Sequence, residues 1–326
     1  MTKIKDDAKV YYRHIDKKFF LVYYYNNNNY FINIMKNEKS ENILNKKEEN
    51  MSYYVPKKNE FQIDAQKENM WNNSKSLVEK ITREGWQKYI DGLGELAKKL
   101  FEEKKKNEIL CMDEGLSSVG DEEIGCVGSA GSGILLAKKT GEYLTEDELA
   151  NYYLGIGFNK IDCFSAHANC GAAKKRFGGT QEEADQKAKK FLQTVAETVN
   201  KTFRYHKELT RPEEFHIATV GYYIGTEDFN LKVLIGKNKL PEGFRISRRY
   251  FDELSGKADA ELAVEIALNH GFCNKFGKDN PFVLVAVADA DNPKFSLDKM
   301  KAELEEVAKK FGDKVRVDGF TAPSKK

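Results

Sequence analysis

Residues 160–166 read Lys-Ile-Asp-Cys-Phe-Ser-Ala, and this mainly apolar stretch between two helix signals decides the fold class. A short apolar run with these boundaries predicts a buried strand. Capping-box signatures, in which Glu follows Thr by three residues, lie on both sides of it, at Thr145 with Glu148 and at Thr180 with Glu183. A strand between two helices is the repeating unit of an α/β protein with a mainly parallel sheet.

The same alternation continues along the chain. Apolar residues recur at three- and four-residue steps over 74–104, which predicts one long or two consecutive amphipathic helices. The other expected elements are strands at 109–112, 214–223, 230–236, 282–288 and 314–318, and helices at about 146–154, 181–203, 247–269 and 296–311. The sequence therefore predicts an α/β fold with a mainly parallel central sheet flanked by helices. It shows no internal repeat.

The first 70 residues differ from the rest in composition. Residues 1–50 contain nine Asn, four of them consecutive at 26–29, beside tyrosines and lysines. Low-complexity polar sequence buries too little apolar surface to offset the entropy lost on ordering. We therefore expect residues 1–70 to form a disordered extension and residues 71–326 to form the α/β domain, with 204–326 completing that domain or forming a separate lobe.

Composition excludes several functional classes. The 326 residues carry 53 Lys+Arg against 51 Asp+Glu, a formal net charge of +2, so a nucleic-acid partner is not expected. No apolar run reaches the roughly 20 residues that span a bilayer, so no membrane partner is expected either. Five cysteines without a recognisable secretory leader predict reduced thiols or metal ligands in a cytoplasmic protein.

Side chains able to bind a metal lie at the ends of two expected strands. Cys111 and Asp113 lie at the end of the strand expected at 109–112, and His167 and Cys170 follow the strand expected at 160–166. The carboxyl ends of parallel strands open on one edge of a sheet, where α/β proteins place their sites. Two thiolates and one imidazole suit Zn²⁺ and leave a fourth position for water or a carboxylate. Asp113 is a candidate for that position or for hydrogen bonding to a metal-bound water.

This pattern resembles the β-class carbonic anhydrases. The shared features are Cys-x-Asp after a strand, a Gly-Asp and small-residue segment, and a His-x-x-Cys-Gly motif that begins 56 residues after Cys111. Here the middle segment is Gly-Asp at 120–121 followed by Val-Gly-Ser-Ala-Gly-Ser at 127–132. The match covers about residues 75–180.

The resemblance implies a reaction and a role for each residue. Cys111, His167 and Cys170 would be zinc ligands, and Asp113 the catalytic carboxylate beside the metal. The family's reaction is attack of zinc-bound hydroxide on carbon dioxide to give bicarbonate, so these are the implied small-molecule substrates. The resemblance also implies a homodimer formed by exchange of N-terminal helices, here the stretch 74–104.

One position departs from the family pattern. The family has Arg two residues after the Asp, where it keeps that carboxylate off the metal, and this chain has Gly115. Without this partner Asp113 is free to close the site as a Cys-His-Cys-Asp tetrahedron, which is structural or inactive. Four arginines are candidates to supply a substitute guanidinium: Arg176, Arg245, Arg248 and Arg249. The alternative hypothesis is a zinc-binding relative without hydration activity, in a structural or sensing role or acting on a related small molecule such as carbon disulfide.

The remaining cysteines and glycines have simpler explanations. Cys126 and Cys163 sit in apolar strand-like runs and are expected in the core, and Cys273 has no partner motif except a faint pairing with His270. The glycines at 125–133 leave open a third hypothesis, a nucleotide-binding α/β protein. Their order is not Gly-x-Gly-x-x-Gly and no P-loop Lys follows, so close backbone packing explains them better.

Overall fold

The computed structural model describes residues 9–15, 18–25, 28–32, 65–102, 104, 106–113, 124–138, 140–156, 161–207, 217–227, 229, 231–235, 237–269 and 271–324. The chain divides into two compact units, Met1–Tyr54 with Asn151–Phe158, and Val55–Ala150 with Asn159–Lys326. Most of the expected extension at 1–70 lies outside the described residues, and its boundary stays a prediction. No helix in the described part is long and apolar enough to cross a bilayer.

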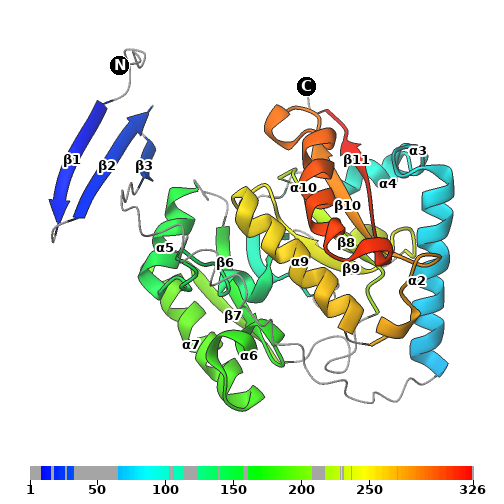
Figure 1. Ribbon diagram of the computed structural model, residues 1–326, viewed down its shortest axis with the longest axis horizontal. Helices are drawn as coiled ribbons and strands as arrows, with labels where there is room; N and C mark the ends of the chain where they lie inside the picture. The colour runs from blue at the N-terminus through cyan, green and yellow to red at the C-terminus, as the bar shows by residue number, and fades with distance from the viewer. Residues whose placement is uncertain are drawn as a thin grey trace. The chain divides into compact units, whose positions relative to one another are not determined.

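Three N-terminal strands form a small antiparallel sheet of their own. They are β1 (Lys9–Ile15), β2 (Lys18–Tyr25) and β3 (Asn28–Ile32), in the order β1-β2-β3. The other strands of the described residues belong to two parallel four-stranded sheets in the larger unit, which confirms the predicted α/β class (Figure 1).

The first parallel sheet carries both motifs singled out in the sequence. Its strands are β4 (Lys106–Cys111), β5 (Ile124–Ser129), β6 (Ile161–His167) and β7 (Thr202–His206), in the order β5-β4-β6-β7. Cys111 pairs with Ser129, and His167 pairs with His206, so both motif residues lie at the carboxyl edge. Helices α6 (Gly171–Phe177) and α7 (Gln181–Thr198) connect β6 to β7. Helix α7 begins with the predicted capping box.

The second parallel sheet lies between two layers of helices. Its strands are β8 (Val220–Ile224), β9 (Gly243–Ile246), β10 (Phe282–Asp289) and β11 (Val315–Ala322), in the order β9-β8-β10-β11. Helices α9 (Glu253–Asn269) and α10 (Leu297–Lys309) pack on one face. The N-terminal helices α2 (Ala65–Glu84), α3 (Trp86–Gly92) and α4 (Glu95–Leu100) pack on the other (Figure 1).

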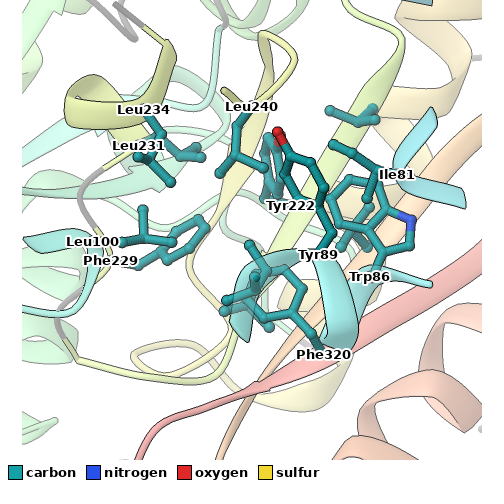
Figure 2. Close-up of a cluster of buried hydrophobic side chains, with 14 of the residues drawn as sticks. Ile81, Trp86, Tyr89, Leu100, Tyr222, Phe229, Leu231, Leu234, Leu240 and Phe320 are labelled. Carbon is teal, nitrogen blue, oxygen red and sulfur yellow. The ribbon is translucent and has the colours of Figure 1, made fainter. Parts of the chain in front are cut away.

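An aromatic cluster attaches the N-terminal helices to the second sheet (Figure 2). Trp86 of α3 stacks on Phe320 of β11, with 6.1 Å between ring centroids and 4° between planes, and meets Tyr222 of β8 edge-on. All three side chains are buried, and full burial of such rings contributes about 1.5–3 kcal/mol each. The stretch 74–104 thus covers a sheet of its own chain. The homodimer implied by the resemblance stays a prediction.

Both parallel sheets repeat one topology that the sequence does not reveal. In each sheet the second strand along the chain lies at one edge, followed by the first, the third and the fourth. The two second strands, β5 and β9, meet at these edges. Gly128 N donates to Ser247 Oγ and Ser247 N donates to Gly128 O, each over 2.9 Å, and Arg245 N donates to Met112 O over 2.9 Å. The described part of 204–326 therefore contains all four strands of the second sheet, which is joined edge to edge with the first.

Three local predictions were wrong. The strand expected at 230–236 is the short helix α8 (Leu231–Ile235), because buried Leu231 and Leu234 follow helical spacing and periodicity is ambiguous in so short an apolar run. The helix expected at 181–203 ends at Thr198, and strand β7 begins at Thr202. The residues of β7 alternate only weakly between buried and exposed, so there was no clear strand signal in this part of the sequence. The helix expected at 247–269 begins only at Glu253. Residues 247–252 form the turn that connects β9 to this helix.

The remaining described elements are short connections and one further helix. They are η3 (Ala130–Gly133), α5 (Glu146–Gly155), η4 (Cys273–Lys275), η5 (Pro293–Phe295) and η6 (Gly312–Lys314).

The junction between the sheets requires glycine at position 128. A Cβ there would lie 2.2 Å from the carbonyl oxygen of Arg245, a backbone atom that cannot move aside without breaking the junction. We expect Gly128→Ala to lower the free energy of unfolding by about 1–3 kcal/mol, as measured by urea denaturation. Gly92→Ala is the control, because a Cβ there meets nothing within 4 Å. Equal stability of the two variants would contradict this account of the junction.

Candidate metal centre

The three predicted ligands come together at the carboxyl edge of the first sheet. Cys111 is the last residue of β4, His167 is the last residue of β6, and Cys170 is the N-cap residue of α6. One ligand atom from each residue lies within 4.8 Å of the other two. The residues are 7%, 2% and 3% exposed, so this group of two thiols and an imidazole is shielded from water. The predicted spatial grouping is confirmed.

The ring of His167 is held in the orientation that a metal ligand needs. Its Nδ1 lies 2.8 Å from the carbonyl oxygen of Ala168, which can only accept, so Nδ1 carries the proton of that hydrogen bond. Its Nε2 is buried and has no nitrogen or oxygen partner among the described residues; the side chain with which it interacts is Cys111. A buried imidazole nitrogen beside a buried thiol is an arrangement that could hold a metal ion.

The electrostatics of the three residues also fit a cation. The hydrogen bond with Cys170, together with burial, raises the pKa of the Cys111 thiol well above its usual value. Burial lowers the pKa of His167, but the neighbouring Cys111 and the charge of Asp113 outweigh this and raise the pKa to about 9. Without a metal, the raised pKa values keep protons on the Cys111 sulfur and the His167 ring. A divalent cation at the same atoms would displace these protons and compensate the charge of the resulting thiolate.

Hydrogen bonds from neighbouring backbone and side chains orient the two cysteines. Gly131 N donates to Cys111 Sγ over 3.2 Å. On the other side, the buried carboxylate of Asp185 accepts from Asn169 N over 2.6 Å and from Cys170 N over 3.1 Å. Such second-layer contacts fix the geometry of metal ligands. No local sequence pattern marked Asp185, because it lies on α7 and its carboxylate accepts hydrogen bonds from the turn that precedes α6.

The small-residue segment packs closely beside the centre. Gly131 has φ +57°, and a Cβ there would lie 2.8 Å from Cβ of Ala172 in α6. Ser132 also has a positive φ, of 59°, and its Oγ donates to the carbonyl oxygen of Ser165 over 2.5 Å. These contacts are those expected of a tightly packed turn rather than of a nucleotide-binding loop.

Asp113 lies two residues beyond the end of β4 and is partly exposed. Its carboxylate is close enough to raise the pKa of His167. Its predicted roles as fourth ligand or catalytic carboxylate stay predictions. Gly115 lies outside the described residues.

Three of the four candidate arginines are bound elsewhere. Arg248 donates to Glu303 over 2.8 Å, and Arg176 donates to the carbonyl oxygen of Leu144 over 2.5 Å. Arg249 bridges Asp289 and Glu227. The backbone N–H of Arg245 donates to Met112 O, next to Asp113, and Arg245 is only 2% exposed.

The second sheet has an ion-pair cluster at the corresponding edge. Asp289 ends β10 as His167 ends β6, and Asn292 caps η5 three residues later as Cys170 caps α6. Arg249 donates to Asp289 over 2.9 Å and to Glu227 over 2.6 Å. Within the described part of the chain, a group of three side chains that could hold a metal ion therefore lies in the first sheet, and the corresponding edge of the second holds an ion-pair cluster instead.

The other cysteines lie apart from the triad. Cys163 is buried in β6, Cys126 is half-buried in β5 and Cys273 is half-buried in η4. His270, the faint partner proposed for Cys273, lies outside the described residues.

No protein-family model, curated protein or solved structure matches this chain. The resemblance to β-class carbonic anhydrases rests on the motifs of 111–170 and on the buried triad that they form.

One acidic residue near the centre predicts a pH dependence of stability. Burial raises the pKa of Asp259 from 3.8 to about 6, although hydrogen bonds from Ser129 and Ala130 lower it. The folded state thus holds this proton more tightly than the unfolded chain, and ionisation destabilises the fold as the pH rises from about 4 to 6. We expect metal-free Asp259→Asn to gain about 2–3 kcal/mol relative to wild type between pH 4 and pH 7, measured by urea denaturation. A difference that does not change with pH would contradict this.

Proposed function

We propose that this chain is a zinc protein of the β-carbonic-anhydrase type, with Cys111, His167 and Cys170 as ligands. The observation that carries the proposal is the buried group itself: one ligand atom each from Cys111, His167 and Cys170 lies within 4.8 Å of the other two. Two thiolates and an imidazole favour Zn²⁺ over the harder cations Mg²⁺ and Ca²⁺, which prefer oxygen ligands.

The proposed activity is the reversible hydration of carbon dioxide. Three protein ligands leave one coordination position open, and zinc held in this way supplies an oxygen nucleophile at neutral pH. Asp113 accepts a hydrogen bond from water on the substrate side and orients it. Arg245, whose backbone N–H donates to Met112 O, is the candidate to take the place of the arginine absent at position 115. The substrates are the small molecules carbon dioxide and bicarbonate, and the homodimer belongs to this proposal as well.

A second candidate function is a closed zinc site without hydration activity. Two observations favour it. The three ligands are almost fully buried, and Gly115 replaces the arginine that would keep Asp113 away from the metal. In this case Asp113 is the fourth ligand and the site has a structural or sensing role.

The test combines metal analysis with stopped-flow carbon dioxide hydration on the full chain between pH 7 and 9. We expect one zinc per chain and a hydration rate that rises with pH. Cys111→Ser and His167→Ala should lose both the metal and the rate, because each removes one of three ligands. Cys273→Ser should keep both, because Cys273 lies apart from the triad.

Two other outcomes have definite meanings. Zinc without hydration at any pH supports the closed site, and Gly115→Arg should then raise the rate strongly if the missing arginine is the cause. A wild-type chain that binds no zinc, or zinc that survives in both Cys111→Ser and His167→Ala, rejects the site itself.

A further inference from the structure

We infer that Asp259, on helix α9 beside the second sheet, is a positioning residue for the metal centre of the first sheet. The inference rests on the proposed zinc site and adds a residue that no motif of the sequence indicated. It also gives helix α9, which packs on the second sheet, a part in the same site.

Asp259 reaches the turn that follows β5. Its Oδ2 accepts a hydrogen bond from Ser129 Oγ over 2.7 Å and another from Ala130 N over 3.3 Å. The residue is 6% exposed, so these two donors compensate a carboxylate that has little access to water. Lys175 of α6 adds a favourable charge nearby.

The same turn contacts a proposed metal ligand directly. Gly131 follows Ala130, and its N–H donates to Cys111 Sγ over 3.2 Å. An N–H that donates to a thiolate stabilises the charged sulfur and fixes its direction. The position of this N–H depends on the turn that Asp259 holds, so Asp259 acts on Cys111 through one intervening turn.

The turn needs such support because its backbone is unfavourable. Gly131 and Ser132 both have φ near +60°, a conformation that costs free energy for the non-glycine residue. Ser132 Oγ holds the turn from the first sheet by donating to Ser165 O, and Asp259 holds it from the second. A hydrogen bond from each side fixes where the Gly131 N–H points.

The charged form of Asp259 is unfavourable for the fold at neutral pH. Burial raises the pKa of Asp259, so an asparagine of the same shape should suit the fold better at neutral pH. Stability and metal affinity should therefore change in opposite directions in Asp259→Asn.

The experiment measures the zinc dissociation constant of the full chain by competition with a chelator at pH 7.5. We expect zinc affinity to fall about 10-fold in Asp259→Asn and between 10- and 100-fold in Asp259→Ala, in line with other second-layer substitutions. Ser129→Ala should weaken binding similarly. The double variant should lose no more than the larger single effect, because both residues act through one turn.

Cobalt substitution gives a readout that does not depend on activity or stability. The thiolate-to-Co²⁺ charge-transfer band should shift in Asp259→Asn, because the Cys111 sulfur changes its hydrogen bonding. Glu265→Gln is the matched control: it removes a partly buried carboxylate from the same helix, near the same Lys175, without a contact to the turn. Its zinc affinity and cobalt spectrum should match wild type.

The outcomes separate this inference from the proposed function. Wild-type zinc affinity, within twofold, in both Asp259→Asn and Asp259→Ala overturns the role of Asp259 and leaves the zinc site standing. Equal losses in Glu265→Gln and Asp259→Asn assign the effect to charge at α9 in general, which also overturns it. A wild-type chain that binds no zinc rejects the proposed function. If Asp259→Ala does not fold, Asp259→Asn and Ser129→Ala still decide the question.

Discussion

The close approach of Gly128 and Ser247 is the constraint on which the rest of the larger unit depends. Two reciprocal hydrogen bonds between these residues join the edge strands of the two parallel sheets, and only glycine leaves room for the facing carbonyl. An exposed sheet edge is a site for unwanted pairing, and this junction covers the edge of β5. It also brings α9 against the turn after β5, so Asp259 can contact Ser129.

The two sheets share a topology and differ in chemistry. The carboxyl edge of the first holds two thiols and an imidazole, whereas the corresponding edge of the second holds Arg249 between two carboxylates. Arg249 holds both carboxylates in ion pairs. The second sheet packs against the N-terminal helices through the cluster around Trp86 and Phe320, and helix α9 on its other face supplies Asp259.

Local signals predicted the ligands, and contacts distant in sequence escaped prediction. Cys111 and His167 end apolar strands, and the capping box at Thr180 marks the helix beyond Cys170, so the sequence near these residues predicted both the strands and the site. No local pattern could show that Gly128 faces Arg245 or that Asp259 contacts Ser129, because each pair is more than a hundred residues apart. The repeated topology escaped for a related reason: it lies in strand order, which different side chains can produce.

The measurement that tests the central claim most directly is zinc K-edge X-ray absorption on the zinc-loaded full chain. The account predicts two sulfur ligands at about 2.3 Å and at least one imidazole nitrogen at about 2.0–2.1 Å, with the remaining ligand nitrogen or oxygen. The Cys111→Ser chain, if any zinc is retained, should show one sulfur fewer. A spectrum with four sulfurs, or with nitrogen and oxygen alone, would contradict a Cys111, His167 and Cys170 site.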